Sequence, residues 1–170
     1  RVPRGNMLFY GNLSDFPFTG GQGIFETRFE VDQLELAYDP EWPHVIDLGG
    51  EVLFLQGGLQ VDLRKGLSDK VKINQAKVTI PALGKSEHLL VQGELETGIL
   101  QGLEFMQQTP LKSPVDKLLD AVEPQGNTQV ILDLKLPLAD GATARVNGSA
   151  QLGNARLRVK ALDLGVTQIN

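Results

Sequence analysis

The sequence contains no cysteine, only two histidines and no long apolar run. The absence of cysteine excludes disulfides, thiolate metal sites and cysteine nucleophiles. His44 and His88 leave few candidates for transition-metal binding or general-base catalysis. Apolar runs reach only four residues, as in Val52–Leu55, whereas a membrane-spanning helix needs roughly 20.

Basic residues are also comparatively few: 16 Lys and Arg stand against 21 Asp and Glu, so the formal net charge is −5. This balance argues against a nucleic-acid-binding surface, which normally carries a basic excess. The sequence has no P-loop, no calcium loop and no zinc-ligand spacing, and none of its serines lies in a nucleophile elbow. We therefore predict no catalytic residue, no metal site and no cofactor.

Most of the chain alternates apolar and polar residues with a period of two, which is typical of strands with two unlike faces. In the first long strand the alternation of Phe25–Val31 slips before Leu34, which indicates a β-bulge. Gly57-Gly58 predicts a two-residue hairpin turn, and a strand from Val71 is predicted to end before Pro81. Val130–Leu136 is predicted as a further strand.

After a predicted turn at Asp140-Gly141, the stretches 142–152 and 155–166 are expected to form two more strands. Apolar alternation continues to Val166 without a terminator, so we expect residues 1–170 to be a single segment of a longer chain.

A helical insertion at about 98–123 interrupts the strands. A helical period predicts a short first helix over 98–108. Ser113 is the expected N-cap of a second helix, which Pro124 is expected to end. Its apolar stripe, Val115–Val122, is predicted to lie on the open side of the sheet; binding to a partner or a membrane is the other possibility.

Charged residues gather around Trp42: Asp39, Glu41, His44 and Asp47. They could form a catalytic cluster, but a histidine acts as a base only beside a positioned partner, and the sequence indicates none. We interpret this segment as a proline-containing loop with its charges facing water and Trp42 covering one end of the core.

Together these patterns predict a mainly β fold: a strongly twisted, partly open antiparallel sheet that forms a half-barrel groove with a short helical insertion. A closed barrel or a sandwich would instead pack one apolar face of each strand against side chains. An open sheet would leave an apolar trough, which favours a lipid-like ligand. The residues predicted to line the concave side are Phe29, Leu34, Leu36, Tyr38, Val52, Phe54, Val61, Leu63, Val71, Ile73, Val78, Ile80, Val130, Leu132, Leu134 and Leu136.

Several segments resemble the AsmA-like envelope proteins, most closely their YhdP branch. The more specific ones are Asp15–Phe18 (Asp-Phe-Pro-Phe) and Tyr38–Pro43 (Tyr-Asp-Pro-Glu-Trp-Pro). Weaker similarity is carried by 24–31, 50–54, 103–111 and 146–157.

The resemblance implies a segment of a repeat-built periplasmic protein of a Gram-negative bacterium, anchored in the inner membrane by a helix outside these residues. It implies no catalytic residues. The implied function is the passage of phospholipid acyl chains through a hydrophobic groove between the inner and outer membranes, which supports the outer-membrane permeability barrier. The rest of the same chain would continue the sheet. The alternative function is a structural or protein-docking β module with a packed interior.

Overall fold

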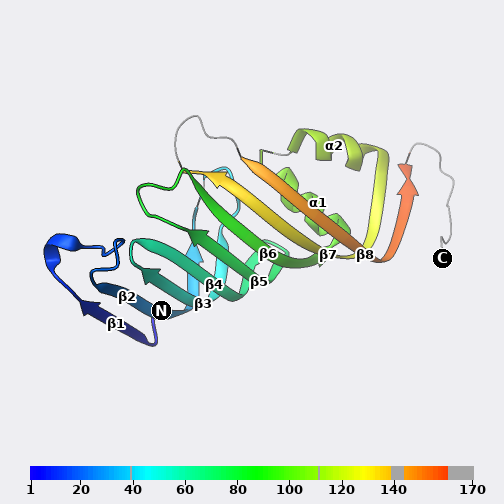
Figure 1. The fold of residues 1–170 in the computed structure, drawn as a ribbon. Helices are drawn as coiled ribbons and strands as arrows, with labels where there is room; N and C mark the ends of the chain where they lie inside the picture. Colours follow the sequence, from blue (N-terminus) through cyan, green and yellow to red (C-terminus); the bar gives the residue numbers. More distant parts are fainter. Residues whose placement is uncertain (39, 111, 139–143, 161–170) are drawn as a thin grey trace.

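The computed structural model describes residues 1–38, 40–110, 112–138 and 144–160. They form one antiparallel sheet in the order β1-β2-β3-β4-β5-β6-β7-β8, so each strand pairs with its neighbours in the sequence. The two edge strands, β1 and β8, are far apart and the sheet is not closed into a barrel, which confirms the predicted fold class (Figure 1). The strands are β1 (Gly5–Tyr10), β2 (Ile24–Leu36), β3 (Val45–Leu55), β4 (Gly58–Ser68), β5 (Val71–Ile80), β6 (His88–Gly98), β7 (Val122–Pro137) and β8 (Arg145–Val159).

The sheet curves because β-bulges interrupt its long strands. The register of β2 against β3 shifts between Val31 and Leu34, and Gln33 has a φ of 53°. This bulge lies where the slip in the alternation predicted it. On β3, Asp47 has a φ of 51°, and the register with β4 shifts between Ile46 and Gly49. Each bulge adds a residue to one strand and increases its bend, so the sheet acquires an inner and an outer side.

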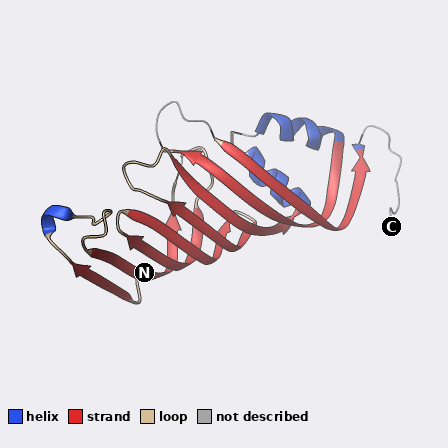
Figure 2. Cartoon of the chain, in the orientation of Figure 1, coloured by secondary structure: helices blue, strands red, loops and turns tan. Residues whose placement is uncertain are grey.

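The predicted insertion contains two helices: α1 lies behind β7 and β8 in Figure 2, and α2 lies above their upper ends. Helix α1 (Ile99–Gln107) agrees with the prediction, whereas α2 (Lys112–Ala121) begins before Ser113, which is therefore not its N-cap. Because α2 ends at Ala121 and β7 follows at once, Pro124 does not end the helix but lies within the strand. The predicted stripe is only partly covered: Val115 is 4% exposed but Leu118 is 46% exposed.

One turn prediction and one strand prediction are wrong, both because of backbone geometry. The β3–β4 turn is Gln56-Gly57, one residue before the predicted pair, and both residues have positive φ (46° and 87°), as a type I′ turn requires. Residues 145–159 form one strand rather than two, because Asn154 at φ 51° and a register shift at Gly126 let β7–β8 pairing continue. The turn expected at Asp140-Gly141 and residues 161–166 of the last predicted strand lie outside the described residues.

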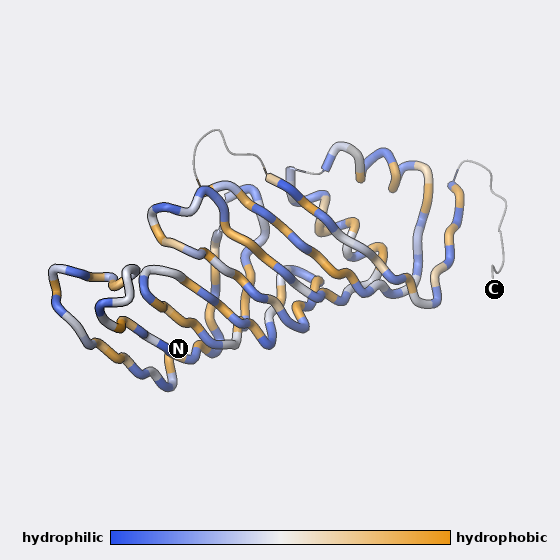
Figure 3. The backbone as a smooth tube through the Cα atoms, in the orientation of Figure 1, coloured by the Kyte–Doolittle hydropathy of each residue, from blue (hydrophilic) through white to orange (hydrophobic). Residues whose placement is uncertain are grey.

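The buried core is small and is spread over several elements of the fold. In the described residues, the buried apolar side chains are Phe18, Val31, Leu48, Val71 and Val115, and Phe18 alone among them is fully buried. The ring of Phe18 lies 5.3 Å from that of Phe9 and 6.0 Å from that of Phe16. Along the strands apolar and polar residues alternate (Figure 3), and most apolar side chains remain partly exposed. The sheet is therefore a single layer, with helices over only part of it.

Candidate functional site

The candidate site is a set of apolar rows that cross the strands on one face of the sheet. Residues directly opposite one another on antiparallel strands project to the same face. The longest row takes one residue from each strand from β2 to β8: Phe29, Val52, Val61, Val78, Val91, Leu134 and Val146.

Further rows run beside it. One contains Phe54, Leu59 and Ile80, and the pair Leu89–Leu136 lies farther along the same side. Another contains Val31, Gly50, Leu63, Ala76, Gly93, Leu132 and Gly148. A last row, closest to the helices, contains Ile73, Leu95, Val130 and Ala150.

These rows lie on the side of the sheet that α1 covers. In β6, Leu95 and Thr97 project to the same face because they are two residues apart. A Cβ built on Gly102 of α1 would lie 3.0 Å from Cγ2 of Thr97, so α1 packs on this face. We call the face with the apolar rows the inner face and the opposite one the outer face.

The outer face has a different chemistry at the same strand positions. Its corresponding row is polar: Glu51, Asp62, Lys77, Gln92, Asp133 and Asn147. The described sheet is therefore apolar on one face and mostly charged or amidic on the other. That difference explains the period of two in the sequence.

The predicted lining residues fall into three groups. Twelve occupy the rows of the inner face and are half-buried: Phe29, Val52, Phe54, Val61, Leu63, Ile73, Val78, Ile80, Val130, Leu132, Leu134 and Leu136. Val71 is only 6% exposed, so it belongs to the core. Leu34, Leu36 and Tyr38 are more exposed and lie at or beyond the bulged end of β2.

Cross-strand pairing also identifies inner-face residues that were not among the predicted ones. They are Leu59, Leu89, Val91, Leu95 and Val146. Alternation within each strand contained this signal, but only the register shows which phase of one strand matches that of the next.

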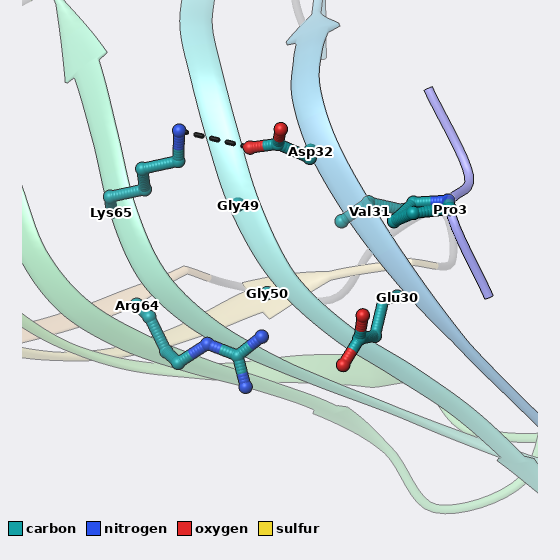
Figure 4. Close-up of a pocket in the computed structure, with 8 residues that line it drawn as sticks. All are labelled: Pro3, Glu30, Val31, Asp32, Gly49, Gly50, Arg64 and Lys65. Atoms are coloured by element: carbon teal, nitrogen blue, oxygen red, sulfur yellow. Dashed lines mark ion pairs between the residues drawn. The ribbon is translucent and has the colours of Figure 1, made fainter.

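A polar hollow of about 360 Å³ lies at the bulges of β2, β3 and β4. It is lined by Pro3, Glu30, Val31, Asp32, Gly49, Gly50, Arg64 and Lys65 (Figure 4). Lys65 Nζ lies 3.0 Å from Oδ1 of Asp32 and 3.0 Å from Oδ1 of Asp47, so it links β4 to both β2 and β3.

Hydrogen bonds shift the pKa values of Lys65 and Asp32 in this hollow. The bond to Asp47, followed by the bond to Asp32, raises the pKa of Lys65, and the bond from Lys65 lowers the pKa of Asp32. A Cβ on Gly49 would lie 2.5 Å from Cε of Lys65, so glycine is what lets the lysine stem cross β3. The arrangement braces the bend of the sheet and offers no nucleophile with an adjacent base.

An ion pair, hydrogen bonds and a ring contact hold the loop around Trp42. His44 Nδ1 lies 3.0 Å from Oε1 of Glu35, and both side chains are more than half exposed. Ser68 donates hydrogen bonds from Oγ to the carbonyl oxygens of Pro43 and His44. The ring of Trp42 lies 6.5 Å from that of Phe105 in α1, so the loop is attached to the helix. Asp39 lies outside the described residues.

No group of three His, Asp or Glu side chains in the described ranges is arranged to hold a metal ion. No helix in the same ranges is both long and apolar enough to span a membrane.

Comparisons with known proteins identify a matching family and a relative. The family model described as YhdP protein matches residues 1–170. The chain is 26% identical over 157 residues to the intermembrane phospholipid transporter YhdP of Escherichia coli (strain K12), across 92% of this chain. It spans 12% of the length of that relative. No solved structure matches the chain.

Proposed function

The chain belongs to the YhdP family, and from this premise we propose that its inner face lines a groove for phospholipid acyl chains. The protein would bind the chains and let them pass without catalysing a reaction. The observation that carries the proposal is the apolar row from Phe29 to Val146, which crosses seven strands without a polar interruption.

The physical chemistry of the inner face suits an acyl chain. Such a chain needs a continuous apolar surface and no directional bonds, and its burial contributes roughly 25 cal/mol per Å². A half-exposed apolar face of this extent is unfavourable in water, so a ligand that covers it is stabilised. Phospholipid is the proposed class because the E. coli relative is named as a transporter of it.

The alternative, a structural or protein-docking β module, predicts that side chains fill the interior. Instead, the inner-face residues Val61, Val78 and Leu134 are half-buried, and Val146 at the edge is 64% exposed. This exposure favours the groove.

We further place the segment in the periplasm, within a protein anchored in the inner membrane that helps maintain the outer-membrane barrier. The edge strands β1 and β8 each have one side without a partner strand among the described residues. The rest of the chain would extend the sheet there, since the E. coli relative is about eight times longer than the matched part.

Photocrosslinking in the intact protein tests the groove. A photoreactive amino acid at Val78 on the inner face should capture phospholipid in cells, which mass spectrometry of the adduct would identify. Its neighbour Lys77 on the outer face is the matched control and should give none. Equal capture at both positions, or none at Val78, would refute the proposal.

A further inference from the structure

The rim of the sheet on the side of the helices has a step. Strands β4, β5 and β6 end there at Ser68, Val71 and Gly98. Gly98 is opposite Asn127, but β7 continues five residues beyond that point, from Gly126 to Val122, and pairs there with β8. At ~3.3 Å per residue, the part of β7 that continues past the end of β6 is about 16 Å long.

Helix α1 lies across this low part of the rim. It follows β6 directly, and its far end reaches the β4–β5 turn, where Lys70 Nζ lies 3.1 Å from Oε2 of Glu104 and Gln108 donates to Asp69. Phe105 continues the contact to Trp42 in the β2–β3 loop. Figure 1 shows α1 between the upturned part of β7 and that loop.

The length of α1 fits the width of the gap. Nine residues of helix at 1.5 Å each give about 13.5 Å. Three strands at ~4.8 Å spacing occupy about 14 Å. Helix α1 is therefore long enough to run from the end of β6 to the β4–β5 turn.

The side of α1 that faces the sheet is apolar. Gly102 packs against Thr97, and Ile99 and Met106, three residues before and four residues after it, share its face of the helix. The helix is apolar on other sides too, with Leu100, Leu103 and Phe105, yet none of its residues is buried. Its polar residues, Gln101, Glu104 and Gln107, lie on one side only, so the rest of α1 is an apolar surface that is only partly covered within the described residues.

We propose that α1 is a section of the groove wall and that Ile99 and Met106 contact the acyl chains of bound phospholipid. The assignment rests on the proposed function. Its support is continuity: Thr97, against which α1 packs, is the next inner-face residue after Leu95 in the apolar row nearest the helices. An acyl chain on that row would meet the apolar side of α1.

Photocrosslinking at four positions of the intact protein tests the assignment. The probe is placed at Met106, at Ile99, at Val78 as the inner-face reference, and at Leu118 as the control. Leu118 is an apolar, 46% exposed residue of the neighbouring helix α2. We expect phospholipid adducts at Met106, Ile99 and Val78, and no adducts at Leu118.

The other outcomes separate the two proposals. Adducts at Val78 without adducts at Met106 and Ile99 would overturn the role of α1 and leave the groove intact. An absence of adducts at all four positions would overturn both. Adducts at Leu118 equal to those at Met106 would show unspecific contact with lipid and would also overturn the role of α1.

A matched pair of charges gives a second measurement. Met106→Glu should impair lipid transport, because it places a carboxylate where acyl chains pass, whereas Leu118→Glu should not. Both residues are partly exposed, so neither substitution buries a charge in a closed core. Full activity of the Met106→Glu protein at normal abundance would overturn the assignment.

Discussion

A single charge on the inner face separates an open groove from a packed core. Leu134 lies three residues before the end of β7, directly between Val91 of β6 and Val146 of β8. Leu134→Arg places a guanidinium in the longest apolar row. The matched control is Ile131→Arg, three residues away on the outer face, where Ile131 is 58% exposed and opposite Glu94.

The expected loss of stability is small. Complete burial of a leucine contributes about 1.5–3 kcal/mol, and Leu134 is partly exposed, so the lost contact costs about 1–2 kcal/mol. The long arginine stem can bring its charge to water, so a large desolvation penalty is avoided. At about 2–4 °C per kcal/mol for a domain of this size, we expect the melting temperature to fall by less than about 8 °C. A packed interior would cost more than about 4 kcal/mol.

Function should be lost although the fold survives. The assay is the uptake of a hydrophobic fluorescent dye by cells whose only copy of the protein is the variant, with abundance measured by immunoblot. We expect high uptake with Leu134→Arg and parental uptake with Ile131→Arg, both at normal abundance. Parental uptake with Leu134→Arg would refute the groove at this point, and a collapse of its abundance would indicate a packed interior.

Three further predictions concern the bend and the loop. Gly50→Ala should destabilise the fold by about 2–4 kcal/mol, since its Cβ would meet a backbone carbonyl of β4. Gly49→Ala should cost only about 1 kcal/mol, because the flexible side chain of Lys65 can move. Thermal unfolding compares the two variants, and equal losses would contradict this geometry. The lowered pKa of Asp32 means that its pairing stabilises the fold above the unfolded carboxyl pKa and is lost as the pH falls, while the raised pKa of Lys65 keeps the ammonium charged until the pH rises through that pKa. Lys65→Gln should therefore weaken the acid dependence of the melting temperature, and unchanged acid dependence would exclude the brace. His44→Ala should change stability by less than about 0.5 kcal/mol and leave dye uptake at the parental level, since its ion pair is exposed; a complete loss of function would revive a catalytic role for this loop.

Alternation was sufficient to predict most of the strands because the two faces of the sheet meet different surroundings. The strand Val71–Ile80 was predicted at both ends, and the bulge before Leu34 followed from the slip in phase. The first half of β3 gives no strand signal in the sequence, because Asp47 and the two adjacent glycines at Gly49-Gly50 interrupt its apolar pattern. Those same residues form the bulge, so the feature that bends the sheet also hides the strand.

The register could not be predicted from the sequence. It depends on turn geometry, and moving the β3–β4 turn by one residue exchanges the faces of every side chain in one strand relative to the other. Alternation alone therefore identified Val61 and Val78 as members of an apolar face but not as neighbours in one row. Leu59 and Val91 lie in the apolar rows of the inner face, but they were not among the predicted lining residues.

The helices show what local sequence patterns leave undetermined. The helical period located α1 within one residue, but its position depends on partners far away in the sequence, Trp42, Lys70 and Thr97. The local pattern also does not show that β4, β5 and β6 end before β7 and β8 at this rim. A strand can extend a sheet only by backbone hydrogen bonds to a neighbouring strand, whereas α1 satisfies its own backbone and attaches through side chains. For that reason α1 can shift without breaking the β ladder.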